Sequence, residues 1–64
     1  MTVKEIRGLT ELSQRAFSVK YNIPIRTIED WEAGKRKAPD YVLLMLERIV
    51  REDFNKPEEK NIDN

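Results

Sequence analysis

The sequence contains no cysteine and no histidine, and these two absences exclude several classes of protein. Without cysteine there is neither a disulfide framework nor a thiolate metal site. Without histidine, the usual zinc sites and histidine general bases are absent as well. Ser13 and Ser18 have no base to activate them, and Glu29 and Glu32 would make at most half of a metal site. We therefore expect no enzyme activity, no metal and no cofactor.

Long apolar segments are also missing. The N-terminus, MTVKEIRG, lacks the apolar run of a signal peptide, and the longest apolar run, residues 41–46, is far too short to span a membrane. We therefore expect a cytoplasmic protein with no membrane partner. The 64 residues suffice for one small domain, whose core is marginal unless its helices pack well or a second subunit shares it.

The formal net charge is zero, but the charges are unevenly distributed along the chain. Residues 13–37 carry six basic and three acidic side chains, whereas residues 52–64 carry two basic and five acidic side chains. A basic segment beside an acidic one is compatible with nucleic-acid binding, because the local field at the contact matters more than the total charge. The zero total predicts modest non-specific affinity.

Hydrophobic spacing and cap residues predict a compact all-α domain. Thr2 and Glu5 fit a capping box, and Val3, Ile6 and Leu9 would form the buried side of the helix that follows. We assign residues 1–54 to this domain and expect residues 55–64 to form a disordered, polar acidic tail. Four helices are expected, at about residues 3–9, 14–21, 24–33 and 39–53.

The stretch from residue 13 to residue 37 predicts two short helices joined by a tight turn. Asn22 stands where the chain must reverse, and asparagine tolerates a left-handed backbone. Pro24 and Pro39 have the φ angle of a first helical position, and Gly34 can end a helix as a left-handed cap. Ser13 can cap the first of the two helices. Their expected buried residues are Phe17 and Tyr21 in the first, and Ile28 and Trp31 in the second.

This stretch resembles the helix-turn-helix of the Cro and phage-repressor family, also called XRE-type, with the likeness extending over about residues 7–50. Gln14 stands where that family has a glutamine opening the first helix of the motif, and Ser18 stands where a small residue lets the two helices cross. An apolar residue, Ile23, follows the turn. The motif ends in the segment 31–34, W-E-A-G, with basic residues behind it. The chain departs from the family at Asn22, where glycine is usual, although asparagine can hold the same conformation.

The resemblance implies that a basic residue of the first helix, Arg7, pairs with Glu32 at the end of the recognition helix. A solvated arginine is the alternative. It also implies that the helix at residues 24–33 enters the major groove of double-stranded DNA, where Arg26 can offer two donors to guanine. Asp30, four residues later, would orient Arg26 or accept from a cytosine amino group, or the two would form only a solvated ion pair.

Two sets of DNA contacts follow from this reading. The expected base contacts are Gln14, Ile25, Arg26, Thr27 and Asp30. The expected phosphate contacts are Ser13, Arg15, Lys20, Lys35, Arg36 and Lys37. Phosphate contacts fix register and add salt-dependent affinity. The alternative for Lys35, Arg36 and Lys37 is a basic loop that is only a solvated surface, and we favour phosphate contact because the run stands next to the motif.

The last expected helix is apolar over about half of its circumference, which is wide for so small a domain. That arc comprises Val42, Leu43, Met45, Leu46, Ile49 and Val50, with Phe54 at its end. Leu44 lies outside the arc. It is either a scattered surface leucine or a dimer contact, and we favour the dimer contact. The expected dimer interface is Tyr41, Leu44 and Met45.

Together these features predict a homodimeric transcriptional repressor on a roughly palindromic operator, with half-sites about one helical turn apart. The alternative is a protein-interaction module, such as an antitoxin subunit, that binds a partner protein encoded nearby through the last helix and the tail.

Overall fold

The computed structural model describes residues 1–54, and the expected disordered tail, residues 55–64, lies outside the described part. Residues 1–54 form four α-helices and no strand, which confirms the all-α prediction. The helices are α1 (Val3–Thr10), α2 (Gln14–Tyr21), α3 (Ile25–Ala33) and α4 (Asp40–Phe54). Their ends differ from the expected ones by a single residue at most.

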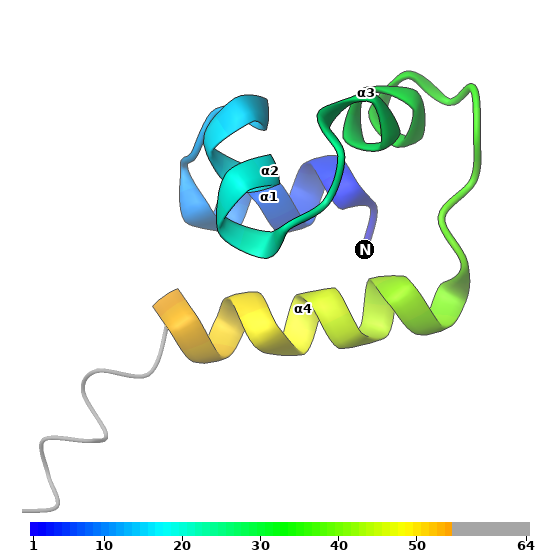
Figure 1. Cartoon of the computed structure of the whole chain (residues 1–64). Helices are drawn as coiled ribbons and strands as arrows, with labels where there is room; N and C mark the ends of the chain where they lie inside the picture. Colours follow the sequence, from blue (N-terminus) through cyan, green and yellow to red (C-terminus); the bar gives the residue numbers. More distant parts are fainter. Residues whose placement is uncertain (55–64) are drawn as a thin grey trace, which may run out of the picture.

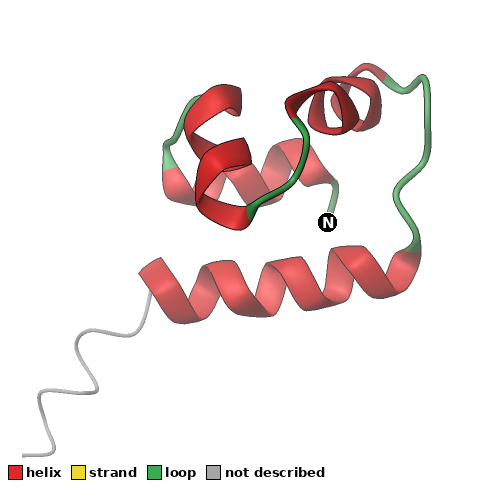
Figure 2. Cartoon of the chain, viewed as in Figure 1, coloured by secondary structure: helices red, strands yellow, loops and turns green. Residues whose placement is uncertain are grey.

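The three short helices lie together on one side of α4, which runs along them as the longest helix of the described chain (Figure 1). α1 packs against both α4 and α3, and α2 packs against α3. Short loops join the first three helices, whereas the longer linker of residues 34–39 carries the chain from α3 to the start of α4 (Figure 2). The helix pair α2–α3 therefore packs against the other two helices, α1 and α4.

Local side-chain chemistry explains where α1 and α2 begin. The Thr2 hydroxyl accepts from the Glu5 backbone N–H at 3.1 Å, and the Glu5 carboxylate accepts from the Thr2 N–H at 2.9 Å. This is the expected capping box. The Ser13 hydroxyl accepts from the Ala16 N–H at 3.1 Å and caps α2.

The helix ends are set by left-handed residues. Asn22 ends α2 with φ 56° and ψ 43°, as expected, and Gly34 ends α3 with φ 83°. Glu11, which carried no such signal, ends α1 with φ 61°. Its N–H donates to the Gly8 carbonyl at 3.3 Å, so a left-handed turn closes α1 without glycine or asparagine.

The two prolines were expected at first helical positions, and the structure places both one residue earlier. Pro24 is the N-cap of α3, and its ψ of 134° is extended, whereas a helical residue needs a negative ψ. Its carbonyl accepts from the N–H groups of Thr27 and Ile28. The Pro39 carbonyl accepts in the same way at the start of α4. The ring fixes only φ, so it suits either position.

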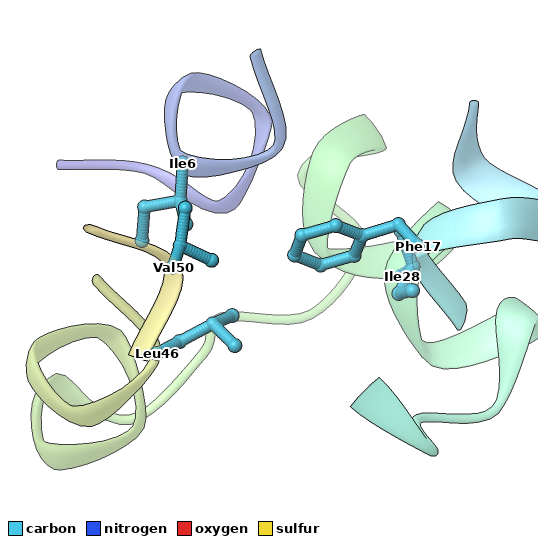
Figure 3. Packing of buried hydrophobic residues seen from close by; sticks show 5 residues of the cluster. All are labelled: Ile6, Phe17, Ile28, Leu46 and Val50. Carbon is cyan, nitrogen blue, oxygen red and sulfur yellow. The ribbon is translucent and has the colours of Figure 1, made fainter. Parts of the chain in front are cut away.

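The core takes at least one side chain from every helix. Five buried residues make up this cluster: Ile6, Phe17, Ile28, Leu46 and Val50 (Figure 3). Leu9, Leu12, Tyr21, Ile23 and Leu43 pack around it, partly buried. The rings of Phe17 and Tyr21 lie 4.9 Å apart between centroids, tilted by 57°. Because single residues tie the helices together, each carries a large share of the packing energy.

Trp31, expected as a second buried anchor of α3, is only partly buried and lies outside the core cluster. Each helical residue rotates the side-chain direction by about 100°, so Trp31 points about 60° away from Ile28. On that flank, α3 faces the N-terminus and the linker rather than the centre of the domain. The three-residue spacing does put Ile28 and Trp31 on one side of α3, but other elements cover only part of that side.

The C-terminal end of α4 is fastened to the end of α2. The Tyr21 hydroxyl donates to the Asp53 carboxylate at 2.9 Å, and the Lys20 ammonium lies 3.9 Å from the same carboxylate. That ammonium also lies over the rings of Tyr21 and Phe54, 5.5 and 5.6 Å from their centroids. Burial, together with the hydrogen bond to the Asp53 carboxylate, raises the pKa of Tyr21 to about 12.

Two valines, one buried and one exposed, allow the effect of core packing on stability to be measured apart from the effect of residue type. Val50 is fully buried and Val19 is 76% exposed. Val50→Ala should lower the free energy of unfolding by about 2 kcal/mol, from lost burial and the cavity left behind. Val19→Ala should be neutral or slightly stabilising, because alanine is the better helix former. Urea denaturation followed by circular dichroism measures both, and equal effects would contradict the packing described here.

Candidate nucleic-acid interface

α3 has one buried side and one open side. Ile28 is fully buried, whereas Arg26, Glu29 and Ala33 are exposed. Arg26 and Ala33 lie roughly opposite Ile28 on the helix, and Glu29 lies about 100° from it. Asp30 also lies on the open side, with its side chain 20% exposed. We call Arg26, Glu29, Asp30 and Ala33 the outer face of α3. This face is free to meet a partner without any rearrangement of the core.

The expected base contacts are not equally placed. Arg26 and Asp30 belong to the outer face, while Ile25 and Thr27 are half-buried on its flanks. Gln14 is directed elsewhere: its amide donates to the Glu32 carboxylate at 3.0 Å. Glu29 and Ala33 were not among the expected contacts, although the helical periodicity of α3 would have put both on the open side.

Asp30 pairs with Arg36 rather than with Arg26. Its carboxylate lies 3.9 Å from the Arg36 guanidinium, and its backbone carbonyl accepts from the N–H groups of Lys35 and Arg36 at 2.9 and 3.3 Å. The left-handed Gly34 turns the chain back over the last turn of α3 and so brings Arg36 beside Asp30. Arg26 takes part in none of the ion pairs within residues 1–54.

The same turn fixes the basic run Lys35–Lys37 at the end of α3. Gly34, Lys35 and Arg36 all donate backbone hydrogen bonds to the last turn of the helix. The three basic side chains are exposed. A cationic patch therefore adjoins the outer face of α3, and the backbone of Lys35 and Arg36 is anchored to the end of that helix.

The N-termini of α2 and α3 differ electrostatically from those of the other helices. α1 and α4 carry an acidic residue in the first turn, Glu5 and Asp40, whereas α2 and α3 carry none. Pro24 gives α3 no side-chain cap. The partial positive charge of each helix start is thus left uncompensated by acidic side chains in the two helices of the motif, a setting that favours phosphate.

The remaining expected phosphate contacts are spread out. The Ser13 hydroxyl is occupied by its cap at the start of α2, and Arg15, in the next turn, is exposed and in no ion pair within residues 1–54. Lys20 lies at the opposite end of α2, in contact with Asp53. A phosphate contact by Lys20 would have to compete with that carboxylate, whereas Arg15 is free of such competition.

A carboxylate joins the first three helices. Arg7 on α1 donates to both oxygens of Glu32 on α3, at 2.7 Å from Nε and 3.0 Å from Nη2. Its Nη1 also donates to the Leu12 carbonyl in the loop before α2, at 2.9 Å. Gln14, at the start of α2, completes the set. The pairing of Arg7 with Glu32 implied by the family resemblance is present, and Gln14 is an additional member that the sequence did not indicate.

This network is largely withdrawn from water. The Glu32 side chain is 7% exposed and the Arg7 side chain 21%. Hydrogen bonds from Arg7 and Gln14 and the positive charge of Arg7 lower the pKa of Glu32, outweighing the burial that would raise it. The same pairing raises the pKa of Arg7. The ion pair is therefore intact at neutral pH and holds the last turn of α3 against α1 and α2.

A second exposed feature lies on α4. Tyr41, Leu44, Met45 and Ile49 are 67%, 59%, 56% and 45% exposed. The first three lie roughly opposite Val50 on α4, and Ile49 lies on their flank, about 100° from Val50. We call these four residues the α4 apolar patch. It includes the three expected dimer contacts. Met45 and Ile49 belong to the apolar arc expected from the sequence, but the three short helices cover only the part of that arc centred on Leu46 and Val50.

The Glu32 network can be tested by its pH dependence. Glu32→Gln should lower the free energy of unfolding by about 2 kcal/mol at neutral pH, because it leaves a partly buried arginine without its counter-charge. The folded pKa of Glu32 lies below its ordinary value of 4.5. The unfolded state therefore takes up the proton first, and the stabilisation, complete above about pH 4.5, is lost as pH falls through the folded pKa.

The wild-type protein and the Glu32→Gln variant should therefore converge in stability below pH 4.5, as measured by urea denaturation at several pH values. Glu47→Gln is the matched control, because Glu47 forms a more exposed ion pair with Arg51 within α4. Its effect should be about 0.5 kcal/mol or less. A constant difference between wild type and Glu32→Gln across the acid range would contradict the network.

Two further properties concern residues 1–54. No helix there combines the length and the apolar character needed to cross a membrane. Nor do the described residues hold a group of three or more acidic side chains that could bind a metal ion.

Comparison with protein-family models, with curated proteins and with solved structures found no match to this chain. Its function is therefore inferred from its own residues.

Proposed function

We propose that this protein is a sequence-specific regulator that binds double-stranded DNA through the outer face of α3. The observation that carries the proposal is the position of this face: it is open, backed by a buried residue and by the Glu32 network, and followed at once by the basic run Lys35–Lys37. A rigid helix with a cationic flank is the arrangement needed to enter a groove lined by phosphates.

The dimensions and the chemistry of α3 suit the major groove. An α-helix with its side chains is about 10–12 Å across and the major groove is about 12 Å wide. Arg26, exposed and in no ion pair within residues 1–54, can donate twice to guanine O6 and N7. Glu29 can accept from a cytosine amino group, and Ala33 can contact a thymine methyl. Two acidic residues on this face favour a defined sequence over indiscriminate binding.

Phosphate contacts would come from the positions that surround this face. Lys35, Arg36 and Lys37 follow the C-terminal end of α3, and Arg15 lies near the uncompensated start of α2. Such contacts fix the register of the helix in the groove and make the affinity fall with salt. Because the whole chain carries no net charge, binding depends on this local patch.

The α4 apolar patch supports a homodimer. Two copies joined through α4 would present two α3 helices related by a two-fold axis, which matches an inverted repeat with half-sites about 34 Å apart. Four side chains make a small interface beside the roughly 20–30 residues a side of a standard one, so we expect weak association that DNA strengthens. Occupation of such an operator would block a promoter, which makes repression the simplest mode of regulation.

The same patch favours a second candidate function. Four large apolar side chains in so small a domain are a common sign of a protein-binding surface. A partner protein, as in a toxin–antitoxin pair, would cover the α4 apolar patch in place of a second copy. The contribution expected from the tail falls on residues 55–64, outside the described residues.

Selection of bound duplexes from a random DNA library tests the DNA-binding proposal. We expect enrichment of an inverted repeat by the wild-type protein. Arg26→Ala should lose the preference at one position in each half-site, because one bidentate contact contributes about 1–3 kcal/mol of discrimination. Binding assays on the enriched duplex at several salt concentrations should accompany the selection.

Arg26→Lys is the matched control for charge. It keeps the cation but cannot form the two parallel hydrogen bonds, so it should lose the same preference while retaining the salt dependence of wild type. If no sequence is enriched at low salt, the DNA-binding proposal is wrong. If both variants keep the full preference, Arg26 does not read a base.

Self-association tests the role of α4. Leu44→Glu should abolish dimerisation in sedimentation equilibrium and reduce binding to the inverted repeat, because it places charge within the apolar contact. Val19→Glu makes the same change at an exposed position on α2 and should leave the dimer intact. Both variants should keep the helical circular-dichroism spectrum. A wild-type chain that stays monomeric on the inverted repeat would favour a partner protein at this surface.

A further inference from the structure

A hollow of about 390 Å³ lies beside the basic run. It is an open depression lined by the start of α1, the end of α3, the linker of residues 34–39 and the first turn of α4. Figure 1 shows the N-terminus in the region bounded by these same segments. Its volume is within the range of small-molecule sites in proteins.

The walls of this hollow are mostly apolar. Val3 and Ala38 are buried, Leu43 is half-buried, and the indole of Trp31 contributes the one aromatic surface. The Trp31 side chain makes no hydrogen bond within residues 1–54, so its indole N–H is available to an acceptor. An apolar body can therefore be held here against a large flat ring.

The charged groups at this hollow are all of one sign. Arg36 and Lys37 line it, and no acidic residue does. Arg36 also meets the carboxylate of Asp30 at 3.9 Å, while the arginine side chain remains 63% exposed. Such a loose contact leaves the guanidinium free to turn toward a bound anion. A ligand that places a negative group at the linker would therefore complement the charge of this hollow.

We propose that this hollow binds a small organic anion with an apolar body, its carboxylate or phosphate meeting Arg36 and Lys37 and its body packing on Trp31 and Leu43. The regulatory consequence rests on the proposed function: an anion on these two cations removes them from phosphate contact, so the ligand weakens DNA binding. The site also adjoins the first turn of α4, which carries Tyr41 of the α4 apolar patch.

Trp31 is the single tryptophan of the chain, so all tryptophan fluorescence comes from a residue that lines this hollow. Titration of the full chain with 3-phenylpropionate should give a saturable change in emission. The matched neutral compound, 3-phenylpropionamide, should bind at least about tenfold more weakly, because hydrogen bonds assisted by charge are roughly twice as strong as neutral ones. Octanoate and phenyl phosphate serve as further anions of different shape.

The linker offers a matched set of variants. Arg36→Gln and Lys37→Gln should each weaken binding of 3-phenylpropionate by about tenfold. Lys35→Gln removes an equal charge from the same run, but Lys35 does not line the hollow, so its affinity should equal that of wild type. Circular dichroism should show unchanged helix content in all three variants.

Three results would overturn the site: no saturable change with any of the three anions, equal binding of the neutral amide, or an equal loss in Lys35→Gln. The DNA-binding part is separate. Saturable anion binding with no loss of DNA affinity would keep the site and refute its regulatory effect. Anion binding by a chain that binds no DNA would keep the site and refute the proposed function.

Discussion

The carboxylate of Glu32 is the point at which α1, α2 and α3 are held together. Helices of 8, 8 and 9 residues are too short to be stable alone, so their form depends on contacts with one another. The Glu32 carboxylate accepts from α1 through Arg7 and from α2 through Gln14. A carboxylate that is 7% exposed is tolerated only when it is paired in this way, and this arrangement of the three helices supplies its partners.

The orientation of α3 follows from this constraint. Ile28 fixes the buried side of the helix, the Glu32 network fixes its last turn, and Gly34 returns the chain so that the basic run lies beside that turn. What remains is one open side of α3 that takes no part in the core. α4 is divided between two sides in the same way. It contributes Leu46 and Val50 to the core and leaves the α4 apolar patch uncovered. A second chain can bury this patch.

The features that could be predicted from sequence were those decided by neighbours along the chain. The capping box at Thr2, the cap at Ser13 and the left-handed Asn22 and Gly34 need only a few adjacent residues. Helical periodicity found the core residues Phe17 and Ile28 for the same reason. The local rules also gave the four helices to within one residue at each end.

The features that sequence could not supply depend on which part of each helix another element covers. Periodicity assigns Trp31 and Ile49 to the inner side of a helix, but other elements cover only part of that side, so both remain partly open. The partner of Asp30 was misjudged because Arg26 is near in sequence, whereas the turn at Gly34 brings Arg36 nearer in space. Gln14 suited a DNA contact by position, and only the structure shows its amide on Glu32.

The claim that α2, α3 and the basic run form a DNA-binding surface is tested most directly by nuclear magnetic resonance. A titration of the isotope-labelled protein with a mixed-sequence duplex at low salt should shift the amide signals of Arg26, Glu29, Ala33 and residues 34–37. The signals of Leu46 and Val50, in the buried part of α4, should stay in place. Shifts confined to the α4 apolar patch, or no shifts at all, would contradict the account.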